Sequence, residues 1–332
     1  MKQVNIHGPD QVEINDVPEP TPGPRDALIR VAACGICGSD LGYIKLGGLA
    51  GPTDKPMPIG HEFSGVVEAV GSEVTHIEVG ARVVANPMSN QNQIGNGGGE
   101  GGFAPLVLIP NVADGGAVFE IPDSLPMETA ALAEPLSVGL QGVDKTRPQP
   151  GEKAVVFGAG PIGLSAVAGL KYRGVDDIVS VDYSKKRLEI ARKLGARATL
   201  HPEDDDVWTA IRDLHGTEPL FGAPMAGTDL YVEASGAGVV IGQVLEKAKT
   251  NARMSIVALH RTPIAVNFML VMMKSMEIVG SMAYPDDWSD ALEILTTTDL
   301  SPMITHQFAL EDFHQALAVA QRADEGAKVM IV

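Results

Sequence analysis

Apolar residues in the first third of the chain recur at alternate positions or in short runs, a pattern that predicts β-strands. The expected strands cover residues 12–16, 27–33, 63–70, 81–85 and 103–109. Stretches rich in glycine and proline separate them, so residues 18–24 and 42–60 are expected to form turns or loops. The N-terminal part of the chain is therefore predicted to be β-rich.

The pattern changes at residues 148–151, Pro-Gln-Pro-Gly, which follow an expected helix at 127–143. Beyond this break, strands are expected at 153–157, 178–182, 230–234 and 254–258, and helices at 161–173, 184–194, 208–214 and 239–248. Such alternation is typical of a parallel, doubly wound sheet, which places the chain in the α/β class. The final part is expected to hold helices at 287–296 and 310–322 and a closing strand at 328–332.

Residues 86–102 fit neither pattern, because most of them are glycine, asparagine, glutamine or serine. A segment with so little to bury is expected to be a flexible surface loop. A lid over an active site is the alternative interpretation.

Composition limits the classes of function. A length of 332 residues suits about two domains, and a net charge of −17 argues against binding to nucleic acid or to an anionic membrane. The two cysteines, Cys34 and Cys37, cannot form a disulfide framework, which favours a reducing compartment. With no signal peptide and no apolar run of about 18 residues, we expect a cytoplasmic protein without a membrane span.

The segment Gly158-Ala-Gly-Pro-Ile-Gly163 follows an expected strand and opens an expected helix, which is the context of a dinucleotide-binding turn. Its glycines permit a tight turn, close approach to a pyrophosphate and helix packing, while the helix N-terminus attracts phosphate. The predicted cofactor-binding residues of this turn are Gly158, Gly160, Pro161, Ile162 and Gly163.

Asp182 ends the next expected strand, where a carboxylate can accept hydrogen bonds from ribose hydroxyls. This favours NAD(H) over NADP(H), because a 2′-phosphate would meet a like charge. Lys186 and Arg187 weaken the preference, and Arg187 is included among the predicted cofactor contacts. The alternative is that Asp182 only caps the turn between strand and helix.

Cys37, His61 and Glu62 bring a thiol, an imidazole and a carboxylate into one short region. Three such ligands can hold Zn²⁺ and leave one position open, as catalytic zinc sites do. A zinc knuckle would need a second cysteine pair, and a thioredoxin-like site would need a helix starting at the cysteines, which the pattern does not predict. Cys34 is expected to point into a core. Zinc beside a hydride carrier indicates an alcohol dehydrogenase.

Four motifs occur in an order that resembles the zinc-dependent medium-chain dehydrogenase/reductases, most closely the polyol (sorbitol), threonine and butanediol dehydrogenase branch. The resemblance runs nearly from end to end. The motifs are Gly35-Ile-Cys-Gly-Ser-Asp40, Gly60-His-Glu62, Glu134-Pro-Leu-Ser-Val138 and Gly158-Ala-Gly-Pro-Ile-Gly163. The resemblance implies a GroES-like catalytic domain at 1–136 and 281–332 and a Rossmann domain at 137–280.

The resemblance also implies roles for individual residues. Cys37 and His61 match zinc ligands, and Glu62 and Glu134 both match the remaining carboxylate, so the choice between them stays open. Asp40 matches an acid that orients the ligating histidine. Ser39 matches the hydroxyl that takes the proton of the alcohol. The positions that match backbone contacts to the nicotinamide are Ala258, Leu259, Ser281 and Met282.

Two positions depart from the family's pattern. Residues 86–102 lack the four cysteines of its structural zinc, so only one catalytic zinc is expected. Gly42 stands where relatives often carry a histidine that relays the proton to solvent.

The expected function is interconversion of a secondary alcohol, diol or polyol and its ketone with NAD(H), by a homodimer or homotetramer. A threonine- or sugar-specific dehydrogenase is one alternative. A zinc-free quinone or enone reductase, or a binding protein without catalysis, is the other.

Overall fold

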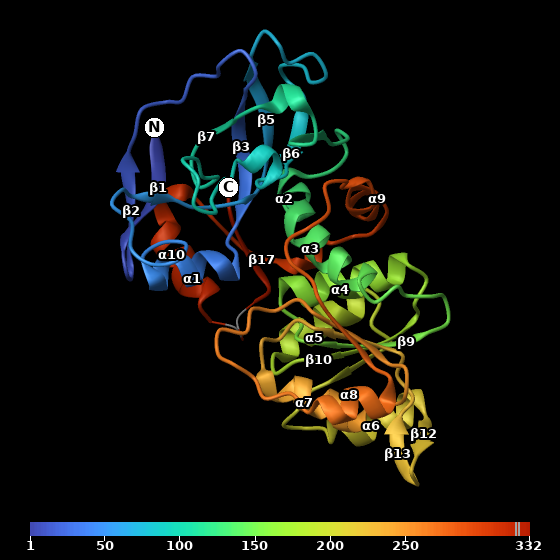
Figure 1. Cartoon of the computed structure of the whole chain (residues 1–332). Helices are drawn as coiled ribbons and strands as arrows, with labels where there is room; N and C mark the ends of the chain where they lie inside the picture. The colour runs from blue at the N-terminus through green and yellow to red at the C-terminus, as the bar shows by residue number, and fades with distance from the viewer. Residues whose placement is uncertain (323, 325) are drawn as a thin grey trace. The chain divides into compact units, whose positions relative to one another are not determined.

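The computed structural model describes residues 1–322, 324 and 326–332, which divide into two compact units (Figure 1). Unit 1 contains Met1–Glu134, Asp286–Arg322 and Lys328–Val332, so both ends of the chain contribute to it. Unit 2 is built around Pro135–Pro285.

Unit 1 is β-rich, as the alternating pattern predicts. Within the described residues, its main sheet has the order β17-β18-β3-β5-β6-β8, and β7 also pairs with β3. These strands are β3 (Ala27–Gly35), β5 (Glu62–Val70), β6 (Arg82–Ala85), β7 (Leu106–Ile109), β8 (Val118–Glu120), β17 (Ile304–Phe308) and β18 (Lys328–Ile331). A smaller sheet has the order β2-β1-β4, formed by β1 (Lys2–Gly8), β2 (Gln11–Asp16) and β4 (Met57–Pro58).

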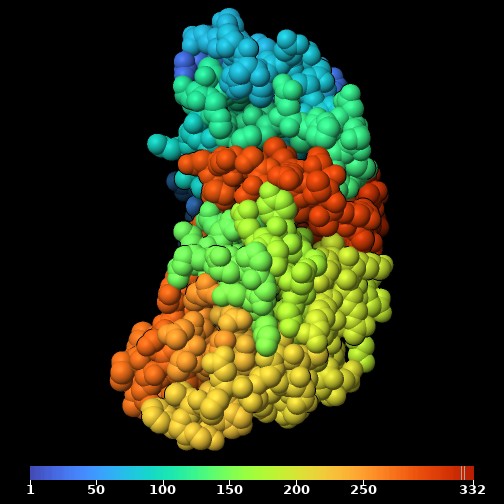
Figure 2. Space-filling model, turned by 90° about the vertical axis from the view of Figure 1, so that its right-hand side faces the viewer, coloured from blue at the N-terminus to red at the C-terminus, as the bar shows by residue number. Residues whose placement is uncertain are grey.

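The helices of unit 1 connect these strands and cover their apolar side chains. They are α1 (Gly38–Leu46), α2 (Met127–Ala130), α9 (Ser289–Thr297) and α10 (Phe313–Ala320), with the short helices η1 (Ser89–Gln91), η2 (Val112–Asp114), η3 (Ser301–Met303) and η4 (Leu310–Asp312). Trp288 stacks on Phe119 with ring centroids 5.4 Å apart, and Phe313 packs on Phe103 at 5.0 Å. Figure 2 shows the red C-terminal segment lying against the green segment that precedes unit 2.

Unit 2 contains a parallel sheet of order β11-β10-β9-β14-β15-β16 within the described residues. Its strands are β9 (Lys153–Phe157), β10 (Asp177–Val181), β11 (Ala198–Leu200), β14 (Leu230–Glu233), β15 (Arg253–Ile256) and β16 (Glu277–Gly280). The helices are α3 (Ala133–Asp144), which starts in unit 1, α4 (Pro161–Tyr172), α5 (Lys185–Lys193), α6 (Val207–His215), α7 (Gly238–Lys247) and α8 (Phe268–Lys274). The predicted fold class is therefore confirmed, with buried apolar side chains on every strand except the edge strand β16.

Several local predictions are wrong. Residues 42–46, expected to be loop, belong to α1, whose apolar residues are spread around the helix rather than gathered on one face. The expected helix at 127–143 is two helices, α2 and α3. The hairpin of β12 (Thr217–Leu220) and β13 (Ala223–Ala226) was not expected, because two prolines obscure its strands. In the part of the chain that the structure describes, no helix combines the length and apolar character that a bilayer crossing requires.

The segment 86–102 also differs from the expectation of a flexible surface loop. Ile94 is fully buried, and the backbone N–H of Gly102 donates to the carbonyl of Gly60 at 2.7 Å. A Cβ atom at Gly95 would lie 2.2 Å from that same carbonyl oxygen. Its glycines therefore allow this segment to pack closely on the backbone that leads to His61.

Candidate functional site

Cys37 is the N-cap residue of α1, between the end of β3 and the helix. Its backbone N–H donates to Oδ2 of Asp40 at 2.9 Å, in a capping box. The thiol of Cys37 therefore lies at the N-terminal end of α1. The expectation that no helix starts at the cysteines is therefore wrong. Cys34, in contrast, lies in the hydrophobic core as predicted, where burial raises the pKa of its thiol well above the usual value.

His61 and Glu62 lie where the chain turns from β4 into β5. Gly60 has φ of +94°, a conformation that favours glycine, and a Cβ there would lie 2.7 Å from the backbone nitrogen of Phe103. Glu62 begins β5 and pairs with Gly35 of β3, so the antiparallel register brings it beside the strand that leads to Cys37.

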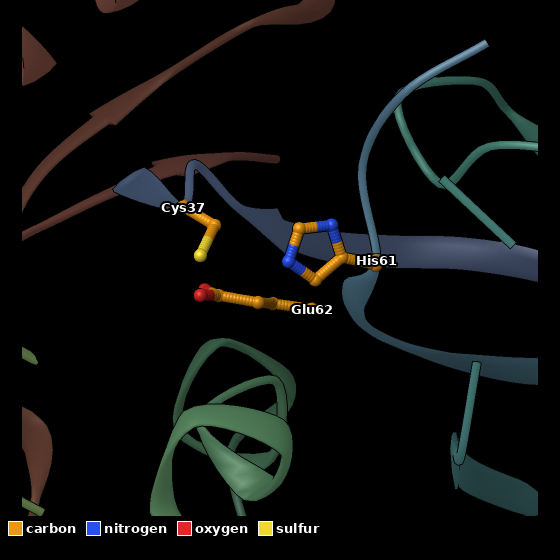
Figure 3. Close-up of side chains that lie close together, drawn as sticks. All are labelled: Cys37, His61 and Glu62. Carbon is orange, nitrogen blue, oxygen red and sulfur yellow. The ribbon is translucent and has the colours of Figure 1, made fainter. Parts of the chain in front are cut away.

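Cys37, His61 and Glu62 each offer one ligand atom, and these three atoms lie within 4.8 Å of one another. Figure 3 shows the thiol, the carboxylate and one imidazole nitrogen directed toward a common point. Zinc ligands lie about 2.0–2.3 Å from the ion, so two ligand atoms of a tetrahedral site are about 3.3–3.8 Å apart, and the three atoms here would close by about 1–1.5 Å at most. The donor set and its spacing therefore fit a zinc ion with only a small closure.

Two side chains that the sequence predicts as supporting residues contact His61. Its Nδ1 lies 3.4 Å from Oδ1 of Asp40, and its Nε2 lies 3.3 Å from the hydroxyl of Ser39. Burial alone would lower the pKa of His61, but the charges of Asp40 and Cys37 outweigh it and raise that pKa well above its usual value. Asp40 and Cys37 therefore favour a positive charge beside the imidazole ring, and a bound metal ion would supply such a charge.

Lys328, which the motifs do not single out, also belongs to the candidate site. Its Nζ lies 2.7 and 2.6 Å from the two carboxylate oxygens of Glu62, and it also donates to the carbonyl of Ile36 at 3.1 Å. Burial would lower the pKa of Lys328, but the charge of Glu62 and that of Cys37 outweigh it and raise the pKa. The sequence does carry one signal for this residue: Lys328 begins an otherwise apolar strand. Such a strand is buried, and a buried cation needs a partner of opposite charge.

Gly35 makes room for this ion pair. A Cβ there would lie 2.2 Å from Oε2 of Glu62 and 3.1 Å from Cδ of Lys328. No larger residue fits without moving the carboxylate, so this glycine belongs to the construction of the site.

Glu134, the second predicted carboxylate, lies in the first turn of α3. Among the described residues it is outside the group of ligands that lie within 4.8 Å of one another. Burial raises its pKa to about 8, with smaller effects from the charges of His61 and Glu62. Burial therefore favours a protonated carboxyl at Glu134, and a cation bound nearby would act in the opposite direction.

The predicted dinucleotide turn of unit 2 is formed as expected between β9 and α4. Gly158 has φ of +93°, and a Cβ at Gly163 would lie 1.7 Å from the carbonyl oxygen of Gly158. Pro161 occupies the first position of α4, followed by Ile162, and the backbone N–H groups of this helix end are available to an anion.

Asp182 supports this turn directly. Its Oδ2 accepts from the backbone N–H of Ala159 at 2.6 Å, and its Oδ1 accepts from that of Ser184 at 2.7 Å. The structural role considered as the alternative is therefore present. Each carboxylate oxygen has a second lone pair, so these bonds leave an acceptor for a ribose hydroxyl.

A hollow of about 610 Å³ in unit 2 is bordered by the glycine turn and by charged side chains. Its lining includes Gly158, Gly160, Asp182, Arg187, Asp205 and Asp206. Arg187 also donates to the carbonyl of Gly326 at 2.7 Å, which fixes its guanidinium near the turn. Ala258, Leu259, Ser281 and Met282 follow the ends of β15 and β16 and do not border this hollow.

Two family models match the chain: "Alcohol dehydrogenase GroES-like domain" over residues 23–123 and "Zinc-binding dehydrogenase" over residues 161–297. The chain is 33% identical to a (R,R)-butanediol dehydrogenase of Neisseria gonorrhoeae, with 94% of this chain and 93% of the relative covered. It is 31% identical to a sorbitol dehydrogenase of Bacillus subtilis, with 100% and 97% covered. The structure of 2R,3R-butanediol dehydrogenase from Bacillus subtilis superposes with a TM-score of 0.87, at 28% identity and 99% coverage of both chains.

The chain therefore belongs to the zinc-dependent medium-chain dehydrogenase/reductases, in their butanediol and polyol dehydrogenase branch. The resemblance inferred from the four motifs is confirmed, as are the GroES-like domain and the Rossmann-type sheet. The chain is an alcohol or polyol dehydrogenase, an enzyme class that uses zinc and a nicotinamide nucleotide.

Proposed function

We propose that this enzyme oxidises a vicinal diol or polyol at a secondary alcohol, with one zinc ion held by Cys37, His61 and Glu62. The convergence of these three ligand atoms within 4.8 Å carries the proposal. The names of the similar proteins, which act on butanediol and sorbitol, supply the substrate class.

Bound zinc would polarise the substrate's C–O bond, and a nicotinamide would accept the hydride. Ser39 is placed to take the alcohol proton at its Oγ, which lies beside Nε2 of His61, while it passes its own hydroxyl proton onward to water. Asp40 holds the imidazole from its Nδ1 side, and it also caps the helix that carries Cys37 and Ser39. Glu134, whose carboxyl favours the protonated form, is assigned a supporting role outside the three ligands.

We infer a preference for NAD(H) over NADP(H) from the charges around the hollow. Asp182, Asp205 and Asp206 line it, whereas Arg187 is the cation among its lining residues. A 2′-phosphate placed among these carboxylates would be repelled.

The proposed nicotinamide contacts remain Ala258, Leu259, Ser281 and Met282. The proposed domain limits remain 1–136 with 281–332 for the catalytic domain and 137–280 for the Rossmann domain.

The same proposal includes a single zinc per chain and a homodimer or homotetramer in solution. The methionine-rich helix α8 exposes Phe268, Met269 and Met272 to solvent, which suits a buried subunit surface. Light scattering of the purified protein measures the number of chains per particle. A monodisperse monomer would contradict this part of the proposal.

The activity is tested with a panel of secondary alcohols, vicinal diols, polyols and threonine, with NAD⁺ or NADP⁺, before and after chelation. We expect NAD⁺-dependent turnover of a diol or polyol that chelation removes and zinc restores. Turnover that survives complete removal of metal would overturn the proposal in favour of a zinc-free reductase. Selective turnover of threonine would move the substrate class to an amino acid.

A further inference from the structure

Glu233 ends β14 at the point where the strand order of the parallel sheet reverses. β14 lies beside β9, the strand that leads into the glycine turn, and the sheet continues outward from these two strands in both directions. Ligands of open α/β sheets bind beyond the carboxyl ends of the strands at such a point. The side chain of Glu233 is fully buried there, so its charge needs partners inside the protein.

One oxygen of this carboxylate holds the loop that follows β14. Oε1 accepts from the backbone N–H groups of Ser235 and Gly236, each at 2.9 Å, and from the hydroxyl of Ser235. Ala234 and Ser235 border the hollow of unit 2, and a Cβ at Gly158 would lie 2.7 Å from the backbone of Ala234. The loop held by Oε1 therefore borders the hollow next to the glycine turn.

The other oxygen holds the loop that follows β15. Nε2 of His260 lies 2.8 Å from Oε2 of Glu233, and the side chain of His260 is 12% exposed. A charged carboxylate only accepts hydrogen bonds, so Nε2 of His260 carries the proton that it donates to Oε2. His260 directly follows Ala258 and Leu259, two of the proposed nicotinamide contacts. One carboxylate thus connects the loop beside the hollow to the loop proposed to contact the nicotinamide.

The pairing of the strands does not require this contact between side chains. The carbonyl oxygen of Glu233 already accepts from the backbone N–H groups of Val257 and Ala258, at 2.9 and 3.1 Å. A Cβ at Gly236 would lie 3.7 Å from the carbonyl oxygen of Leu259, so the two loops lie close together beyond the ends of the strands. The paired side chains therefore act on the loops, by setting how far apart the loops lie.

We propose that the Glu233–His260 pair holds the loops after β14 and β15 at a fixed separation and thereby positions the nicotinamide half of the bound dinucleotide. Both are positioning residues, because they act through the backbone of these loops. Without the pair, the loop after β15 has to be ordered when the cofactor binds, which lowers affinity for the nicotinamide half and spares the rest. This inference rests on the proposed function, since it takes the nicotinamide contacts from that proposal.

The test compares the binding of NADH with that of ADP-ribose, which lacks only the nicotinamide ring, by calorimetry on the purified whole chain. A hydrogen bond to a charged group is among the stronger ones in proteins, so we expect the Kd of NADH to rise about tenfold in His260→Ala. The Kd of ADP-ribose should change less than about twofold, because ADP-ribose does not reach the nicotinamide contacts. If His260→Ala does not fold, His260→Leu, which keeps the bulk without a donor, takes its place.

His260→Gln tests whether the bond to Glu233 is what matters. Glutamine keeps an N–H donor that can reach the carboxylate, so the Kd of NADH should return to within about threefold of the wild type. A loss as large as that in His260→Ala would overturn the inference.

His201→Ala is the matched control. The side chain of His201 is 11% exposed, and its Nε2 donates to the carbonyl of Tyr183 at 2.9 Å. His201 follows β11, at the other edge of the sheet, and Tyr183 borders the hollow. Any loss in this variant should be the same for NADH and ADP-ribose, so the ratio of the two Kd values should stay that of the wild type.

Equal losses for NADH and ADP-ribose in His260→Ala, or an unchanged Kd for NADH, would overturn the inference and leave a purely structural pair. A wild type that binds neither ligand would refute the proposed dinucleotide site itself, whatever these variants do.

Discussion

Glu62 binds the ammonium group of Lys328 at its carboxylate, and the same carboxylate is the proposed ligand of a metal ion. Both oxygens of Glu62 contact Lys328 at 2.6–2.7 Å, and both side chains are about 1% exposed. A buried carboxylate without a partner carries a large desolvation cost. Lys328 therefore compensates the charge of Glu62 when no metal is present, and it limits how strongly Glu62 can bind one.

Lys328→Met tests whether Lys328 compensates the charge of Glu62 in the metal-free protein. We expect the metal-free protein to lose about 3–5 kcal/mol of stability, the range for breaking a buried ion pair, because Glu62 becomes an unpaired charge. Zinc should restore part of that loss, since it brings a positive charge to the same carboxylate. Thermal unfolding of metal-free and zinc-loaded protein measures both effects.

Lys274→Met provides the comparison. Lys274 is also buried, but its Nζ donates to the carbonyls of Leu245, Glu246 and Ala248 in unit 2. Replacing Lys274 should lower the stability of the metal-free and of the zinc-loaded protein equally. The same pattern in Lys328→Met would contradict the link between Lys328 and the metal centre.

At the residue scale, the sequence was sufficient where the functional side chains are close together along the chain. Cys37, His61 and Glu62 lie within one short region, and residue chemistry alone identified them as candidate ligands. Lys328 reaches the site from the other end of the chain through sheet pairing. Its contact depends on register, which the pattern of apolar positions does not specify at single-residue resolution.

At the scale of elements, one short segment supports each candidate site: the turn between β3 and α1 for the metal centre of unit 1, and the turn between β10 and α5 for the dinucleotide turn of unit 2. The first places Cys37 and Ser39 at a helix N-terminus, which the sequence could not predict because α1 has no apolar period. The second places Asp182 where it supports the glycine turn, which strand and helix alternation did predict.

Asp182→Asn separates the structural and cofactor roles of this residue. The two backbone N–H groups bind different carboxylate oxygens, and in asparagine one of these becomes an NH₂ donor, so one N–H loses its acceptor and we expect the melting temperature to fall. If Asp182 also faces the ribose, the preference for NAD⁺ over NADP⁺ in kcat/KM should drop about tenfold, or about 1.4 kcal/mol.

Asp206→Asn is the control for charge alone. Asp206 lines the same hollow, but its carboxylate caps α6 by accepting from Thr209. An equal change of preference in both variants would show that general charge, rather than contact at Asp182, sets the cofactor choice. A lower melting temperature with unchanged preference would leave Asp182 a structural residue.

The segment 86–102 contains a carboxyl group that should make stability depend on pH. Burial raises the pKa of Glu100, although its Oε2 accepts from the N–H of Leu108. The folded protein therefore holds this proton more tightly than the unfolded chain, so stability falls as pH rises from the unfolded pKa through the folded one. Glu100→Gln should remove this slope.

Melting temperatures from about pH 4 to pH 7 check that expectation. The advantage of Glu100→Gln over the wild type should grow as pH rises across this interval. A difference that stays constant with pH, or that grows toward acid, would contradict the direction assigned to Glu100.

For the whole molecule, the sequence predicted the class of fold because each sheet type has its own periodicity. Alternating positions mark the antiparallel strands of unit 1, and apolar runs between helices mark the parallel strands of unit 2. The hairpin of β12 and β13 escaped prediction, because Pro219 and Pro224 occupy strand positions and its side chains are largely exposed. Whether such a hairpin forms depends on its tertiary contacts rather than on the local pattern of apolar residues.

The zinc content of matched cysteine variants tests the central claim most directly. Cys37→Ala and Cys34→Ala are loaded with zinc, freed of excess metal by gel filtration and analysed for zinc per folded chain. We expect about one zinc per chain in the wild type and in Cys34→Ala, and nearly none in Cys37→Ala, because the thiol of Cys37 is a ligand. Full zinc retention in folded Cys37→Ala would contradict the proposed metal centre.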